Sequence, residues 1–117
     1  MNCEPRLLFG SLWTVLIFGL SRAEEVHWKH LQLDSVFRSE GVATADVNHD
    51  GKIDVLVGDL WYEAPHWQIH QIRPASDYDF ARGHSECFSN FAHDVDGDGW
   101  TDQITIGFPG KPCHWYR

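Results

Sequence analysis

Two short acidic loops carry the residues best suited to chemistry. Residues 46–54 read DVNHDGKID and residues 94–102 read DVDGDGWTD, so both follow the pattern D-x-[DN]-x-D-G-x-x-D. Alternate positions place oxygen-bearing side chains on one side of a tight turn, and the glycine at the sixth position permits the sharp bend. Ca²⁺ takes about 6–8 hard oxygen ligands. The pattern therefore predicts a calcium site in each loop.

The predicted ligands come from positions 1, 3, 5 and 9 through side-chain oxygens and from position 7 through the backbone carbonyl. The alternative is a solvated turn, because Asp and Gly favour turns in any case. Without a cation, however, clustered carboxylates repel each other, and two loops of identical spacing favour calcium. The ligands are expected to be Asp46, Asn48, Asp50, Lys52 and Asp54 in the first loop, and Asp94, Asp96, Asp98, Trp100 and Asp102 in the second.

The flanking residues exclude an EF-hand. That motif needs a Glu at position 12 and a helix on each side, but position 12 is Val57 in the first loop and Thr105 in the second. The segment after the first loop is β-branched and alternates, with Ile53, Val55 and Val57 on one face. The loops are therefore expected to join strand to strand, which also counts against the helical, shorter repeat of a dockerin.

The rest of the chain reads as short strands separated by Gly and Pro. No convincing amphipathic helix occurs after residue 23, although residues 26–33 are ambiguous, and residues 73–87 form a longer polar connection. These features predict an all-β fold. Strands are expected near 42–46, 52–58, 60–63, 67–72, 88–93, 101–107 and 113–116.

The two loops belong to an internal repeat of fixed period, in which Asp46 returns as Asp94 and Asp54 returns as Asp102. Each copy is followed by an aromatic segment, which reads WYEAP from Trp61 and HWYR from His114. A fixed period of this size is typical of a solenoid, a propeller or a tandem array.

With these motifs the chain resembles the FG-GAP/VCBS repeats, the calcium-loop blades of integrin-α-like β-propellers in secreted bacterial proteins. The resemblance covers roughly residues 34–117, with one repeat at about 34–75 and an incomplete second at about 84–117. It implies four-stranded antiparallel blades whose inter-strand loops hold calcium, hence a partial β-propeller of one and a half to two blades. A propeller closes with about 4–8 blades. The chain is therefore expected to be a truncated or N-terminal piece of a longer protein; the competing architecture is a small complete sandwich that pairs its open edges with another chain.

The N-terminal residues predict a secretory signal. An apolar run occupies residues 7–20, and small residues, Ser21 and Ala23, precede the expected cleavage point. The run is too short for a comfortable membrane span, which needs about 20 apolar residues, although an uncleaved anchor is the alternative. We expect a helical signal peptide at 1–23, a repeat region at 24–117, and a secreted, periplasmic or cell-surface protein that does not stay in the membrane after cleavage. In such a protein Cys87 and Cys113 form either a disulfide or two buried free thiols.

Charge narrows the possible partners. The chain has 17 acidic and 9 basic residues, a formal charge of −8, and no basic run that could neutralise phosphates, so a nucleic-acid partner is excluded. Seven of the 17 acidic residues lie in the two loops. The acidity is therefore concentrated at the predicted metal sites.

The expected function is a calcium-binding interaction module with a carbohydrate or protein ligand on the propeller face and further blades in cis. The alternative is part of a carbohydrate-active enzyme, since some propellers of this type resemble the aldos-2-ulose dehydratase propeller. Among the eight histidines, His66 and His70 are expected in one strand, about 13 Å apart, too far to share a metal. No nucleophile or zinc motif occurs. No catalytic residue is predicted, and an enzyme is the less favoured interpretation for this chain alone.

Overall fold

The computed structural model describes residues 25–117. The predicted signal peptide lies outside these residues. The chain divides into two units, Met1–His30 and Leu31–Arg117. The described part of the first unit, residues 25–30, is exposed and has neither helix nor strand. In residues 25–117 no helix is long and apolar enough to cross a membrane.

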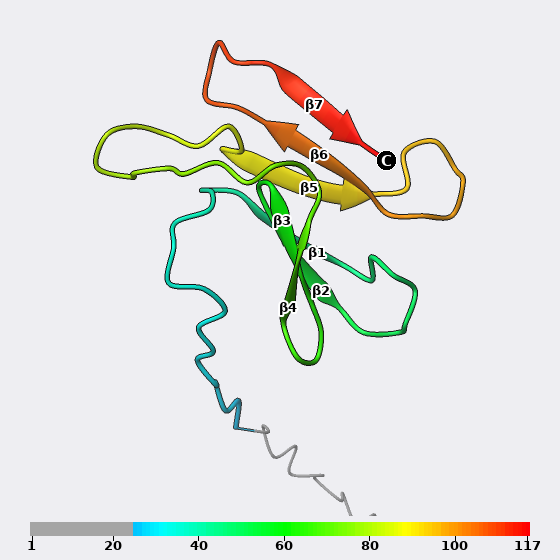
Figure 1. Cartoon of the computed structure of the whole chain (residues 1–117). Helices are drawn as coiled ribbons and strands as arrows, with labels where there is room; N and C mark the ends of the chain where they lie inside the picture. The colour runs from blue at the N-terminus through cyan, green and yellow to red at the C-terminus, as the bar shows by residue number, and fades with distance from the viewer. Residues whose placement is uncertain (1–24) are drawn as a thin grey trace, which may run out of the picture. The chain divides into compact units, whose positions relative to one another are not determined.

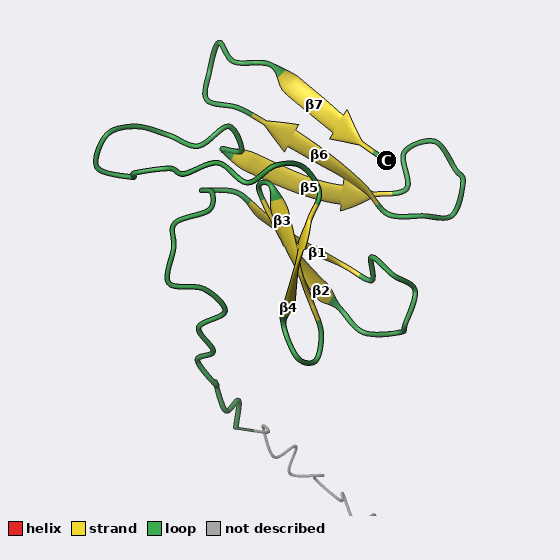
Figure 2. Cartoon of the chain, in the orientation of Figure 1, coloured by secondary structure: helices red, strands yellow, loops and turns green. Residues whose placement is uncertain are grey.

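The second unit is all-β over its described length, and Figure 2 shows strands joined only by loops and turns. All seven expected strands are confirmed, and their observed ends lie close to the expected ones. They are β1 Val42–Ala45, β2 Asp54–Val57, β3 Leu60–Glu63, β4 Gln68–Gln71, β5 Ser89–His93, β6 Asp102–Ile106 and β7 Cys113–Tyr116.

The strands form two antiparallel sheets in which each strand pairs with the next along the chain. The first sheet has the order β1-β2-β3-β4 and the second the order β5-β6-β7 (Figure 1). β2 shows the two-residue alternation of a strand: the side chains of Asp54 and Leu56 are buried, and those of Val55 and Val57 on the other face are half-buried. The β-branched valines also favour an extended backbone. The fold thus has two meanders of four and three strands.

The registers of the two sheets correspond closely. Val55 pairs with Tyr62 in the first sheet, and Gln103, the counterpart of Val55 in the second repeat, pairs with Tyr116 in the second sheet. The two tyrosines are further apart in sequence than the two loops, because the turn at residues 107–112 is longer than its counterpart at residues 58–59. The aromatic segments after the two loops therefore occupy equivalent places in the sheets.

The two sheets pack through their first strands, β1 and β5. At this junction Gly41 N donates to the carbonyl of Cys87 at 3.0 Å. A Cβ atom on Gly41 would lie 2.7 Å from the backbone nitrogen of Asn90, so only glycine fits this close approach. Asn90 Nδ2 in turn donates to the carbonyl of Leu56 at 2.9 Å. Backbone and side-chain hydrogen bonds thus join the sheets directly.

The core is small and mixed. Its buried apolar side chains are Leu56, Leu60, Tyr62, Ala64 and Cys87, and they are accompanied by buried polar side chains such as those of Asp54, Asp102 and Gln103. Cys87 and Cys113 are both free thiols, the first buried and the second exposed, so the structure contains neither of the two arrangements considered from sequence. Burial raises the pKa of the Cys87 thiol.

Candidate metal centre

Each acidic loop connects the first two strands of its sheet. The first loop joins β1 to β2 and the second joins β5 to β6, as expected from the strand-forming flanks (Figure 1). The loops therefore occupy the same place in the two sheets, and their internal geometry can be compared position by position.

The carboxylate at position 1 organises each loop. Asp46 accepts hydrogen bonds from the backbone nitrogens of Asp50 at 3.0 Å and Gly51 at 2.9 Å. In the second loop Asp94 accepts the equivalent bonds, at 3.1 Å and 2.9 Å, from the residues at positions 5 and 6. One carboxylate at the start of the loop thus holds the backbone of the following turn.

Positions 3 and 5 repeat the same arrangement. The side-chain oxygens at position 3, in Asn48 and Asp96, each accept the position 5 backbone N–H at 3.2 Å. The carboxylates at position 5, in Asp50 and Asp98, each accept the position 7 backbone N–H at 2.9 Å. The alternate polar side chains therefore hydrogen-bond to the backbone of their own loop at matching positions.

Position 9 is the most buried residue of each loop. Asp54 is 0% exposed and Asp102 is 1% exposed. Asp54 accepts from Val47 N at 2.9 Å, and Asp102 accepts from Val95 N at 2.8 Å. Burying an ionised carboxylate costs free energy unless donors or a cation compensate it, so these two residues mark where each loop is anchored to its sheet.

Backbone conformation follows the same pattern. Position 6 has a left-handed φ in both loops, 82° at Gly51 and 92° at Gly99. Position 4 is also left-handed, at 60° for His49 and 78° for Gly97. Left-handed φ strains most side chains. Position 6 has the larger φ in each loop and is glycine in both, whereas position 4 accommodates His49 in the first loop.

The second loop brings three carboxylates together. Oxygens of Asp94, Asp96 and Asp102 all lie within 4.8 Å of one another. Two oxygens bound to one Ca²⁺ at about 2.3–2.6 Å lie at most about 5 Å apart, so the spacing fits a single cation. The donor set is entirely oxygen, which suits Ca²⁺ or Mg²⁺ better than Zn²⁺. This cluster could hold a metal ion. Within residues 25–117 it is the one such group of three, so the structure gathers part of the second predicted ligand set and no comparable group in the first loop.

In each loop a basic side chain pairs with carboxylates at positions 3 or 5. Lys52 Nζ is 2.6 Å from Asp50 Oδ2, and its hydrogen bond lowers the pKa of Asp50. In the second loop, Arg117 Nη2 is 2.6 Å from Asp96 Oδ2 and 3.4 Å from Asp98 Oδ2. These side chains offset part of the negative charge that the loops concentrate.

The end of the third strand supplies a partner to position 3, which sequence reasoning missed. Glu63 Oε1 accepts from Asn48 Nδ2 at 3.0 Å, and the residue in the equivalent register place, Arg117, pairs with Asp96. The chemistry of the two contacts differs. In the first sheet the amide of Asn48 donates to the carboxylate of Glu63, and in the second sheet the carboxylate of Asp96 pairs with the guanidinium of Arg117. The shared Trp-Tyr pairs of the aromatic segments were the signal that could have aligned these residues.

The two loops also touch each other. The rings of His49 and Trp100 stack with centroids 4.2 Å apart and planes within 3°. Thr101 Oγ1 donates to the backbone carbonyl of Asp46 at 3.3 Å. The loops therefore form one continuous patch, although they belong to different copies of the repeat.

The histidines of the first sheet do not lie as expected. His66 is in the turn before β4, because that strand begins at Gln68, so the prediction that His66 and His70 share a strand was wrong. His70 stacks on Trp61 at 4.3 Å, and its Nε2 lies 2.6 Å from Glu63 Oε2. Within residues 25–117, no histidine belongs to a cluster of potential metal ligands.

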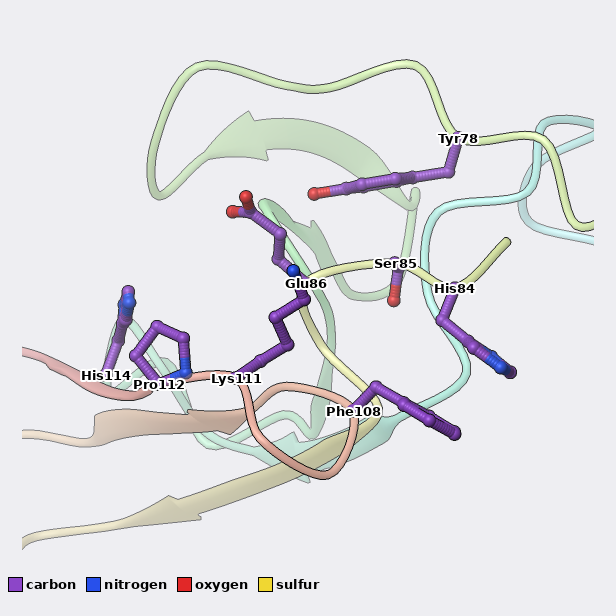
Figure 3. Close-up of a pocket in the computed structure, with 8 residues that line it drawn as sticks. All are labelled: Tyr78, His84, Ser85, Glu86, Phe108, Lys111, Pro112 and His114. Atoms are coloured by element: carbon purple, nitrogen blue, oxygen red, sulfur yellow. The ribbon is translucent and has the colours of Figure 1, made fainter. Parts of the chain in front are cut away.

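A separate cavity of about 400 Å³ lies beside the long turn between β6 and β7. Figure 3 shows Glu86 and Lys111 extending into it, with the ring of Tyr78 on the opposite wall. His84 and Phe108 stack at 4.2 Å on one side. The lining of this cavity combines aromatic residues with two charged side chains, Glu86 and Lys111, and includes no residue of the acidic loops.

Comparisons of the chain with protein-family models, with curated proteins and with solved structures found no match.

Proposed function

We propose that the chain is a calcium-stabilised all-β binding module in which each acidic loop holds one Ca²⁺. The observation that carries this proposal is the recurrence of five loop hydrogen bonds, at matching positions and with nearly the same lengths in both loops. Asp and Asn side chains also make such bonds in solvated turns, but both loops in addition bury an aspartate at position 9, and a buried ionised carboxylate favours a compensating cation. The clustering of Asp94, Asp96 and Asp102 adds a reason for a cation.

The strand arrangement supports a propeller of the FG-GAP/VCBS class. Each sheet is a meander, each loop joins the first and second strands, and the first strands of the two sheets pack together. Successive blades of a propeller place their first strands side by side around the axis. On this proposal the four-stranded sheet is one blade and the three-stranded sheet is part of the next.

Within each site the buried aspartate at position 9 would hold the cation from the sheet side, while positions 1, 3 and 5 close around it. A bound Ca²⁺ supplies positive charge and cross-links these oxygens. Because the ligands come from both ends of the loop, the free energy of metal binding becomes free energy of folding. The metal role is therefore structural: it fixes two loops that meet through His49 and Trp100.

Secretion fits this role. Extracellular calcium modules bind with Kd of about 10⁻⁴–10⁻³ M, so a protein exported by the predicted signal at 1–23 would meet enough calcium to fill such sites. The Ser85 hydroxyl donates to Glu40, and its oxygen accepts from Cys87 N at 3.1 Å. His84 Nδ1 lies 2.9 Å from the other oxygen of Glu40. Because these side chains are already engaged with each other and with the backbone, we propose binding rather than catalysis.

Calorimetry of the purified chain in calcium and in EGTA tests the proposal. We expect two Ca²⁺ per chain and a higher Tm with calcium, because each site at 100 times its Kd adds about 2.7 kcal/mol of stability. For a domain of this size about 1 kcal/mol raises Tm by roughly 4–8 °C. Asp94→Asn should abolish one site, whereas Asp77→Asn, an acidic exposed control outside both loops, should keep two. Identical melting profiles in calcium and EGTA would refute the proposal.

A further inference from the structure

A cleft of about 380 Å³ opens between the two sheets, next to the second acidic loop. Leu56, Trp61 and Gln71 contribute from the first sheet, and Gln103 and Tyr116 from the second. Residues of the loops and the chain end complete it, namely Val47, Ile72, Trp100, Thr101 and Arg117. Its lining therefore comes from both repeats and exists only where the two sheets meet.

Aromatic side chains make up much of the wall. Trp61 stacks on His70 at 4.3 Å, which fixes its ring against the first sheet. Trp100 is 54% exposed and stacks on His49, which fixes its ring against the first loop. Tyr116 is held by Arg73, whose Nη1 donates to its hydroxyl at 2.8 Å. The guanidinium of Arg73 also lies over the Tyr116 ring, 5.5 Å from its centroid. Trp61 and Trp100 thus offer flat apolar surface in the cleft.

Apart from Arg117, the polar side chains of the lining are neutral, and one of them is incompletely hydrogen-bonded. Gln103 is 2% exposed, and its Nε2 donates to the carbonyl of Gly58 at 2.9 Å. Its Oε1 has no partner in the described part of the chain, although buried acceptors are normally satisfied. A hydroxyl donor bound in the cleft would complete this amide. Gln71 and Thr101 add further neutral donors and acceptors.

The cleft carries little charge. Arg117 is its one charged lining residue among those the structure describes, and this guanidinium is paired with Asp96 at 2.6 Å. The cavity beside the β6–β7 turn differs, because Glu86 and Lys111 extend into it (Figure 3). Flat aromatic rings with neutral amides and hydroxyls match a ligand that has one apolar face and many hydroxyl groups. Sugar rings have this chemistry.

We infer that the cleft between the sheets binds a neutral oligosaccharide. The inference rests on the proposed binding role and gives that role a site and a ligand class. A sugar ring lies against Trp61 or Trp100, and its hydroxyls bond to the amides of Gln71 and Gln103.

The test is binding of the full chain, saturated with calcium, to a panel of neutral tetrasaccharides, followed by tryptophan fluorescence and calorimetry. The panel contains cellotetraose, maltotetraose, xylotetraose and mannotetraose, with tetragalacturonate as the anionic comparison. Trp61→Ala should weaken the best neutral ligand at least tenfold, and Gln71→Leu, on the exposed edge strand, several-fold. Trp115→Ala is the matched control. Trp115 precedes Tyr116 in β7, so its side chain lies on the opposite face of the strand; it is 49% exposed and does not line the cleft.

The outcomes separate cleanly. Binding of a neutral tetrasaccharide that is lost in Trp61→Ala or Gln71→Leu and kept in Trp115→Ala supports the inference; Gln71→Leu decides if Trp61→Ala does not fold. No neutral sugar bound at about 10 mM, a concentration that reaches even weak sites, overturns it, as does binding of tetragalacturonate alone or binding that Trp115→Ala abolishes. Calcium stoichiometry is measured on the same samples. Two bound Ca²⁺ without sugar binding would overturn the proposed oligosaccharide site and leave the proposed structural role of calcium unaffected.

Discussion

Arg117 should compete with calcium for the second loop. Its Nη2 lies 2.6 Å from Asp96 Oδ2 and 3.4 Å from Asp98 Oδ2, and its side chain is 63% exposed. Because Asp96 belongs to the three-carboxylate cluster, a cation that enters must either displace the guanidinium or bind beside it. Arg117→Gln removes this competition while keeping a polar, uncharged side chain.

The size of the effect follows from two contributions. An exposed ion pair is worth about 0–1 kcal/mol, which the entering metal must give up. A unit charge about 5 Å from a divalent cation in water adds about 1–2 kcal/mol of repulsion before salt screening. Screening reduces both, and about 1.4 kcal/mol of net relief corresponds to a tenfold change in Kd. We therefore expect Arg117→Gln to tighten calcium binding at the second loop about tenfold.

Calcium calorimetry on an Asp46→Ala background, which silences the first loop, isolates the second site. The matched control is Arg82→Gln, which makes the same change in net charge at a side chain that is 86% exposed and paired only with Asp79 among the described residues. The gain should shrink as salt is raised, because the interaction is electrostatic. An unchanged or weaker Kd in Arg117→Gln would refute the reasoning. An equal gain in Arg82→Gln would show that net charge, and not the local pair, is responsible.

Two further predictions concern buried or partly buried aspartates. In EGTA, Asp54→Asn should lower the free energy of unfolding by about 2–3 kcal/mol, measured by urea denaturation, because both carboxylate oxygens of Asp54 accept backbone N–H groups, from Val47 and Ala64. Asp102→Asn should lower it by about 1 kcal/mol, because the amide oxygen can keep the single backbone hydrogen bond that Asp102 accepts. Burial raises the pKa of Asp34, but hydrogen bonds led by that from Arg38 outweigh it and lower the pKa to about 2. Since the folded pKa lies below the unfolded value, its stabilising contribution is complete above about pH 4 and is lost as pH falls towards 2; acid unfolding of Asp34→Asn should lack this component.

The strands were predictable because their signal is local. Alternation of β-branched residues around Asp54, and the same pattern after Asp102, requires no knowledge of distant partners. The left-handed turn at Gly51 and Gly99 was equally visible in the loop spacing. These features are set by neighbours within one element, so sequence reasoning placed them close to where the structure has them.

The contacts around the loops were not predictable in the same way. Glu63 and Arg117 become equivalent only after the longer β6–β7 turn is allowed for, and the constant period of the repeat hides that alignment. The stacking of His49 on Trp100 depends on how two sheets meet, which no local pattern encodes. The state of Cys87 and Cys113 could not be predicted from sequence either, because it depends on where the fold places them: Cys87 is buried, Cys113 is exposed, and both thiols are free.

These contacts also explain why the two loops should not bind calcium equally. Five hydrogen bonds recur inside both loops, although the second loop has one more, from Gly97 N to Asp94 at 2.7 Å. The clearest difference in charge lies at and around position 3. The first loop has a neutral Asn48 with the carboxylate of Glu63 beside it, and the second has Asp96 held by Arg117. In the second loop the protein supplies its own cation, whereas Glu63 adds negative charge next to the first. The internal repeat thus preserves the backbone of the site and varies its charge through a residue that lies outside the nine-residue motif.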